Sequence, residues 1–147
     1  MRCIRGLSSL AYWGLKSDTT SAAECVTDCK SAIRYLRRNA IRLGIDSEKI
    51  VVVGESAGGH LAAALGTIDG YDEPGEDLAV SAVPNALVRL NPITDMTTRW
   101  GEGLGAKAKS LSPLHHVSKN TPPAKRPRRP GDALMEDFHS GRRFCVR

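Results

Sequence analysis

The sequence contains no apolar run that approaches the roughly 18 residues of a membrane-spanning helix, so a membrane span is not expected. It lacks the Gly-x-Gly-x-x-Gly fingerprint and the Gly-Lys-Ser/Thr ending of a P-loop, which disfavours the commonest nucleotide-binding turns. None of its four cysteines belongs to a Cys-x-x-Cys pair, so no disulfide framework is indicated. Such cysteine usage suits a reducing compartment and favours a cytoplasmic protein over a secreted one.

Two of the cysteines share one face of a predicted helix, because Cys25 and Cys29 are four residues apart. A metal site there would need further ligands, and the sequence supplies none nearby. We therefore expect both thiols to pack in the core.

The charge of the chain is concentrated at its end. The 147 residues are 41% hydrophobic and 25% charged, which is typical of one globular domain, and the net charge is +5. The last 23 residues, from Lys125 on, hold seven Lys/Arg against three Asp/Glu, a net +4. The rest is nearly neutral, so nucleic-acid binding is not expected. A nucleic-acid-associated protein with a basic tail remains an alternative that rests on residues 125–129 alone.

The stretch from residue 50 to about residue 68 gives the clearest structural prediction in the sequence. Ile50 and the three valines after it predict a short, fully buried strand. The next five residues, Gly54-Glu55-Ser56-Ala57-Gly58, match Gly-x-Ser-x-Gly, and an alanine-rich helix is predicted from there to about residue 68. This is the context of a nucleophile elbow, in which a serine is exposed on a strained strand-to-helix turn. A side chain at Gly54 or Gly58 is expected to collide with the neighbouring backbone.

The alternative interpretation of this stretch is a strand, loop and helix of a nucleotide-binding domain, with the glycines around a phosphate. The missing fingerprints named above disfavour it.

The residues before the motif predict an amphipathic helix. Ser21 and Glu24 match a capping box, apolar residues recur every three or four positions to residue 43, and Gly44 suits the position after a helix. The opposite face is basic, and we expect it to be solvated: Lys30, Arg34, Arg37, Arg38 and Arg42. Residues 69–77 are expected to form a surface loop, and 80–84 and 86–92 a further strand region. Helix, loop, strand, tight turn and helix is the pattern of a parallel α/β sheet.

These segments resemble the α/β-hydrolase family, specifically the acetyl esterase/lipase branch related to hormone-sensitive-lipase-like and feruloyl-esterase-type enzymes. The resemblance is carried by residues 28–37, 44–50, 54–61, 91–95 and 112–115. It implies a partial α/β-hydrolase fold, a parallel sheet flanked by helices, over residues 20–124. Residues 1–19 are poorly defined by sequence, and 125–147 are expected to be a basic tail, disordered or non-homologous.

The resemblance implies serine carboxylic-ester hydrolysis through an acyl-enzyme, on short acyl esters, with acetylated carbohydrate as one candidate. Ser56 would be the nucleophile, and the backbone N–H of Ala57 would donate to the oxyanion. A histidine would act as base, oriented by an acid. The expected partner is a small-molecule ester, and neither a metal nor an organic cofactor is required. The sequence does not indicate an oligomeric state.

Candidates for the acid and base are few. His60, His115 and His116 are expected to pack or to lie on loops, and Glu55 is assigned no chemistry. Asp95 is expected to cap a turn, with an orienting role as the alternative. His139 with Asp132 or Asp137 would satisfy the chain order of nucleophile, acid and base, but no strand is predicted to carry them.

The sequence departs from the pattern of the family in two places. The sequence has no His-Gly-Gly-Gly loop before the motif, and a basic, proline-broken run follows residue 124 where the family would continue with an apolar strand. We therefore expect a truncated or frame-disrupted member with impaired activity. The alternative is a catalytically inactive remnant or an interaction protein.

Overall fold

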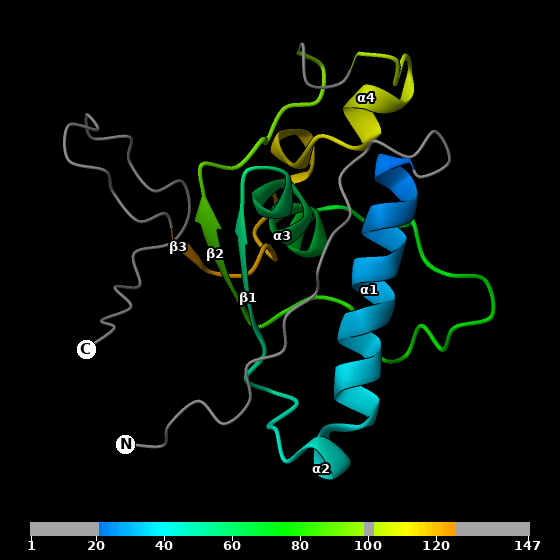
Figure 1. Ribbon diagram of the computed structural model, residues 1–147, viewed down its shortest axis with the longest axis vertical. Helices are drawn as coiled ribbons and strands as arrows, with labels where there is room; N and C mark the ends of the chain where they lie inside the picture. The colour runs from blue at the N-terminus through cyan, green and yellow to red at the C-terminus, as the bar shows by residue number, and fades with distance from the viewer. Residues whose placement is uncertain (1–20, 99–101, 126–147) are drawn as a thin grey trace.

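The computed structural model describes residues 21–98 and 102–125, so the expectations for 1–19, for the end of the chain from residue 126 and for His139, Asp132 and Asp137 lie outside it. Three parallel strands form a sheet in the order β1-β2-β3, with helices packed against it (Figure 1). The elements are α1 (Ala22–Arg38), α2 (Ala40–Leu43), β1 (Val51–Glu55), α3 (Ala57–Thr67), β2 (Ala86–Leu90), α4 (Lys107–Ser110), the 3₁₀ helix η2 (Pro113–His116) and β3 (Ala124–Lys125). No helix in these two ranges is long and apolar enough to cross a membrane.

The helix α1 begins as its sequence predicts. The Ser21 hydroxyl accepts a hydrogen bond from the backbone N–H of Glu24, and the Glu24 carboxylate accepts one from the N–H of Ser21. This reciprocal pair satisfies two N–H groups that have no partner within the helix. The hydrogen bonds to Ser21 also lower the pKa of Glu24.

The predicted helix is interrupted near its end. At Asn39 the backbone leaves helical geometry, and its side-chain amide donates to the carbonyl of Tyr35. Such local hydrogen bonds of asparagine compete with the helical ladder. The short α2 then ends at Gly44 in the left-handed conformation, with φ of 65°. A glycine adopts that conformation without strain, as expected for this position.

Both long helices lie on one side of the sheet. Ile33 of α1, Leu65 of α3 and Ile50 before β1 form one buried cluster, and Cys29 and Val52 pack against it. A second cluster joins α1 and α3 to the segments after β2, and Cys25 is buried in it. Core packing of both cysteines is therefore confirmed, and burial raises the pKa of the Cys29 thiol to about 11.

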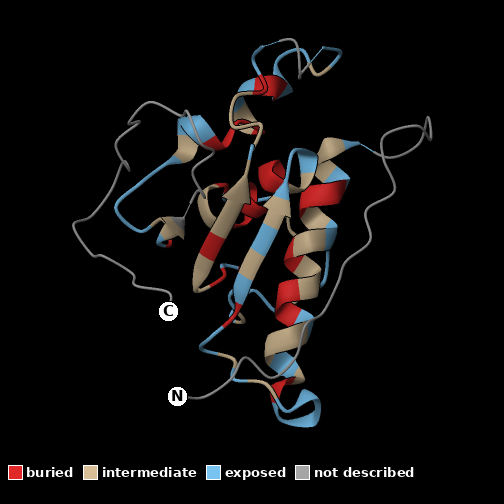
Figure 2. Cartoon of the chain, turned by 60° about the vertical axis from the view of Figure 1, so that its left-hand side comes forward, coloured by how far each residue is buried: buried red, intermediate tan, exposed pale blue. Residues whose placement is uncertain are grey.

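The expectation that β1 is fully buried is wrong. Val51 and Val53 keep 51% and 63% of their surface exposed, whereas Val52 faces the helices. Alternate side chains of a strand point to opposite faces, and the described helices cover only one face of this sheet (Figure 2). The strand region predicted for residues 80–84 and 86–92 is also shorter than expected. Only β2 (Ala86–Leu90) is a strand, and residues 80–84 form none.

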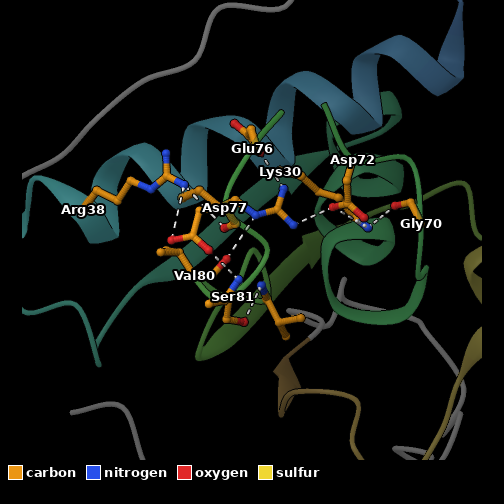
Figure 3. Close-up of polar contacts among 11 residues, drawn as sticks. Lys30, Arg38, Gly70, Asp72, Glu76, Asp77, Val80 and Ser81 are labelled. Atoms are coloured by element: carbon orange, nitrogen blue, oxygen red, sulfur yellow. Dashed lines mark hydrogen bonds and ion pairs between the residues drawn. The ribbon is translucent and has the colours of Figure 1, made fainter. Parts of the chain in front are cut away.

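The basic face of α1 is only partly the solvated surface expected from the sequence: Arg38 and Arg42 are exposed, but Lys30 and Arg34 are each only 5% exposed. The Arg34 guanidinium contacts Asp72 at 2.5 Å and Glu76 at 2.7 Å, and its Nε donates to the carbonyl of Val80. The Lys30 ammonium donates to the Gly70 carbonyl and lies 3.7 Å from Asp72 (Figure 3). The acidic loop between α3 and β2 is thus held against α1 by ion pairs.

Replacing Arg34 by methionine should destabilise the fold, because the partly buried carboxylates of Asp72 and Glu76 would lose their cation. Removing one partner of a fully buried ion pair typically costs about 3–5 kcal/mol, and water that reaches the two carboxylates should keep the loss below that range. Urea denaturation would measure the loss. Arg42→Met is the matched control, since Arg42 is exposed and its loss should change stability by no more than about 0.5 kcal/mol. Equal effects of the two substitutions would contradict the assignment.

Candidate functional site

Ser56 occupies the turn between β1 and α3, at the C-terminal edge of the parallel sheet. Its backbone has φ of 52° and ψ of −116°, a conformation that costs a non-glycine residue energy. Two backbone hydrogen bonds hold it there: its N–H donates to the carbonyl of Leu90, and its carbonyl accepts from the N–H of His60. Ser56 is exposed. The turn thus presents a hydroxyl to solvent from a strained, well-anchored position.

The two glycines of the motif differ in their surroundings. A Cβ at Gly54 would lie 2.1 Å from the carbonyl oxygen of Gly58, so the predicted backbone collision is present there. A Cβ at Gly58 would meet nothing within 4 Å, so the expectation is wrong for this position. The strand and helix approach closely at Gly54, while the missing side chain of Gly58 points into open space. Gly59 marks a second close approach that the sequence did not predict, because a Cβ there would lie 3.0 Å from Pro92.

The N-terminus of α3 adds hydrogen-bond donors to the site. Ala57 is the first residue of this helix and is exposed. The first N–H groups of a helix have no partner within it and carry the positive end of its dipole. The backbone at Ala57 therefore provides an electropositive position immediately after the Ser56 hydroxyl.

A cavity of about 300 Å³ opens beside Ser56, beyond the ends of β1 and β2. In parallel α/β sheets this edge is where ligands bind. A larger hollow of about 630 Å³ lies at the opposite end of the strands, around Arg37 and Asn85, and is remote from the Ser56 hydroxyl. The smaller cavity is lined by Ser56, Asn91, Pro92, Ile93, Thr94, Asp95 and Thr98.

Asp95 caps a turn in the wall of this cavity, as expected. Its carboxylate accepts from the N–H of Thr97 at 2.8 Å and from its hydroxyl at 2.6 Å. The hydrogen bond from the Thr97 hydroxyl is the main reason why the pKa of Asp95 is lowered. His115 also approaches Asp95, with its Nε2 3.9 Å from the carboxylate. The fully buried Ser112 fixes the same wall, because its hydroxyl accepts from the N–H of Met96.

The histidines of the described ranges lie apart from the serine hydroxyl. His60 is buried with its Nε2 2.8 Å from the carbonyl of Leu111, and the Nε2 of His116 lies 3.3 Å from the carbonyl of Lys109. Within residues 21–98 and 102–125, no histidine ring forms a hydrogen bond with the Ser56 hydroxyl, and no group of three or more His, Cys, Asp or Glu could hold a metal ion. The expected base is therefore not brought to Ser56 by the part of the chain that the structure describes.

His60 makes stability depend on pH. Burial lowers its pKa, against the hydrogen bond to Leu111, so folding favours the neutral imidazole. Its contribution should be complete above the unfolded pKa of about 6.5 and be lost as the pH falls toward the lower folded value. Urea denaturation from pH 8 to 5 would measure this. The decline should be smaller in His60→Gln, and an identical decline in both proteins would contradict it.

The chain is similar in structure to an esterase that has been solved in several forms. The apo form of Thermogutta terrifontis esterase 2 matches with a TM-score of 0.69 and 39% identity, over 75% of this chain and 43% of that one. The same esterase phosphoramylated by tabun matches with a TM-score of 0.68 and 39% identity, over 74% of this chain and 42% of that one. A parallel sheet flanked by helices, matched in this way, defines a partial α/β-hydrolase fold of the esterase class.

The chain belongs to the BD-FAE family, whose sequence profile matches residues 13–102. The arylesterase of Saccharolobus solfataricus is 56% identical over 39 residues, which are 26% of this chain and 13% of that protein. The ethyl acetate hydrolase of Pseudomonas putida is 33% identical over 93 residues, 57% of this chain and 26% of that protein. Endo-1,4-beta-xylanase B of Butyrivibrio fibrisolvens is 32% identical over 68 residues, 45% of this chain and 11% of that protein. The chain thus spans about a quarter or less of these relatives.

Proposed function

We propose that the chain carries the nucleophile half of an ester hydrolase site, with Ser56 as nucleophile. The observation that supports this most is the exposed Ser56 hydroxyl on a strained turn between a strand and a helix. This hydroxyl makes no cap hydrogen bond to the helix, and backbone hydrogen bonds to Leu90 and from His60 hold the residue in place. The names of the esterase relatives and structures support the same reaction class.

The proposed reaction is acyl transfer in two steps. Ser56 Oγ attacks the ester carbonyl carbon and loses its proton to a base, and the C–O bond to the alcohol then breaks as the alcohol takes a proton. Water hydrolyses the acyl-serine in the second step and restores the hydroxyl. The Ala57 N–H donates to the oxyanion of each tetrahedral intermediate. One such donor contributes about 2.7–4 kcal/mol in enzymes where it has been removed.

The cavity beside Ser56 suggests the size and chemistry of the substrate. A volume of about 300 Å³ suits a short acyl group, and Pro92 and Ile93 supply apolar surface for it. Asn91, Thr94 and Asp95 supply hydrogen-bonding groups, which suit an alcohol with hydroxyl groups such as an acetylated carbohydrate. An ethyl acetate hydrolase and a xylanase among the relatives are in keeping with these two features.

A second candidate is an α/β-hydrolase remnant without turnover. It is favoured by the absence, within residues 21–98 and 102–125, of a hydrogen bond between a histidine ring and the Ser56 hydroxyl. Without a base the serine remains a weak nucleophile, because its hydroxyl is not deprotonated at neutral pH. Such a protein would retain the fold and lose hydrolysis.

A fluorophosphonate probe and p-nitrophenyl acetate separate the two candidates. The hydrolase should be labelled at the peptide that contains Ser56, seen as an added mass on the intact chain, and should release p-nitrophenol. Thermogutta terrifontis esterase 2 has itself been solved phosphorylated by paraoxon. A folded protein that shows neither labelling nor release would overturn the proposed hydrolase in favour of the remnant.

A further inference from the structure

The cavity beside Ser56 has one charged side chain in its wall. Among the lining residues that belong to the described ranges, Asp95 alone carries a charge, and none is Lys, Arg or His. Glu55 precedes Ser56 in sequence but does not line the cavity. Its side chain lies on the same face of the sheet as that of Val53, because alternate residues of a strand share a face. A molecule bound beside Ser56 therefore meets one negative charge, that of Asp95.

The Asp95 carboxylate is fixed through one of its two oxygens. Oδ1 accepts hydrogen bonds from Thr97 and, at 3.5 Å, from the Ser112 hydroxyl, and it lies 3.9 Å from Nε2 of His115. No residue in 21–98 or 102–125 donates a hydrogen bond to Oδ2. The side chain keeps 31% of its surface exposed. One carboxylate oxygen is thus free to contact a bound molecule, while the other holds the group in position.

The start of α3 supplies the opposite polarity. The N–H groups from Ala57 on carry the positive end of the helix dipole, which suits the ester carbonyl oxygen as it becomes negative during attack by Ser56. Pro92 and Ile93 offer apolar surface to the acyl group. The alcohol portion of the ester is then left to the polar wall that contains Asp95. An ester in this orientation places any charge on its alcohol beside a carboxylate.

We propose that Asp95 selects esters by the charge of their alcohol portion, favouring cationic alcohols over neutral ones and disfavouring anionic ones. This inference rests on the proposed function, because it concerns the substrate that Ser56 attacks. Asp95 is charged at neutral pH, since hydrogen bonds from Thr97 lower its pKa. Two unit charges about 4 Å apart in water change a binding constant about fivefold, and more where protein walls exclude water. Esters of a cationic and an anionic alcohol should therefore differ about 25-fold in kcat/KM.

Three acetate esters of similar shape and different charge test the proposal on the full chain. They are acetylcholine, its neutral tert-butyl analogue and the anionic acetyl isethionate. At low salt and about pH 8, where an imidazole such as that of His115 is usually neutral, kcat/KM should fall in this order. Salt at about 1 M should reduce the differences severalfold, because it shortens the screening length to about 3 Å.

The substitution Asp95→Asn removes the charge and keeps an oxygen that can accept from Thr97. It should lower the ratio of kcat/KM for acetylcholine to that for acetyl isethionate about tenfold or more, and change kcat/KM for the neutral ester less than about threefold. Glu48→Gln is the matched control, because it removes a carboxylate beside the hollow at the opposite end of the strands. It should leave the ratio within about twofold.

The outcomes separate this inference from the proposed function. If the neutral ester is hydrolysed but Asp95→Asn leaves the ratio unchanged, charge selection by Asp95 is wrong and the ester hydrolase stands. If the parent hydrolyses none of the three esters and is not labelled by a fluorophosphonate, both are overturned. An equal loss for all three esters in Asp95→Asn would show a structural role of the turn and also overturn charge selection. If Asp95→Asn does not fold, the parent decides, because equal kcat/KM values for the charged esters at low salt would contradict the proposal.

Discussion

Replacing Ser56 by alanine is expected to abolish covalent labelling by a fluorophosphonate and to reduce ester hydrolysis to the background rate. Only the Oγ atom of this residue is proposed to attack the ester carbonyl, and alanine keeps the backbone but removes that atom. Removing the nucleophile of a serine hydrolase has cost as much as about 10⁶-fold in kcat. Labelling is the sharper readout, since it needs a single attack and no turnover of an acyl-enzyme.

The control must separate loss of the nucleophile from loss of the fold. Ser118 is another exposed serine, in a turn far along the chain, so Ser118→Ala should leave labelling unchanged. Ser56→Ala should unfold at the same urea concentration as the parent, because the Ser56 hydroxyl makes no cap hydrogen bond. Ser118→Ala removes an exposed hydrogen bond to the N–H of Asn120 and should change stability by no more than about 0.5 kcal/mol. Labelling that survives in Ser56→Ala, and maps to another residue, would refute the proposed role.

Features that depend on neighbouring residues could be predicted from the sequence. The capping box of Ser21 and Glu24 and the glycine after α2 are local, because each joins residues a few positions apart. The turn at Ser56 was also predictable, since a β-branched strand and an alanine-rich helix flank it. The fold class follows from these pieces, because short strands that alternate with helices form parallel sheets.

Features that depend on distant residues could not be predicted. Arg34 is buried because Asp72 and Glu76 neutralise it from a loop about 40 positions away. The sequence shows a basic helix face and an acidic loop, but it does not indicate that the two are in contact. The prediction that β1 is fully buried also assumes that both faces of the sheet are covered. Val53 shows that this fails when the helices pack on one face only.

The substitution Gly54→Ala is expected to destabilise the fold strongly, because the added methyl group has no space. It would lie 2.1 Å from the oxygen and 2.4 Å from the carbon of the Gly58 carbonyl. Both atoms are backbone at the start of α3, so no side-chain rotation can relieve the contact, and strand and helix must separate. Overpacked side chains in cores cost about 1–3 kcal/mol, and a clash with fixed backbone should reach or exceed that range. For a small domain with a total stability of about 5–15 kcal/mol, such a loss should lower soluble yield and the urea midpoint sharply.

Gly58→Ala is the matched control, because it adds the same methyl group four residues later in the same motif. Its Cβ would meet no atom within 4 Å, and the residue lies within α3. Alanine should stabilise that helix position by about 0.5–1 kcal/mol relative to glycine. The two substitutions should therefore shift the urea midpoint in opposite directions. If they shift it equally, the close approach of strand and helix at Gly54, and with it the strained support of Ser56, is wrong.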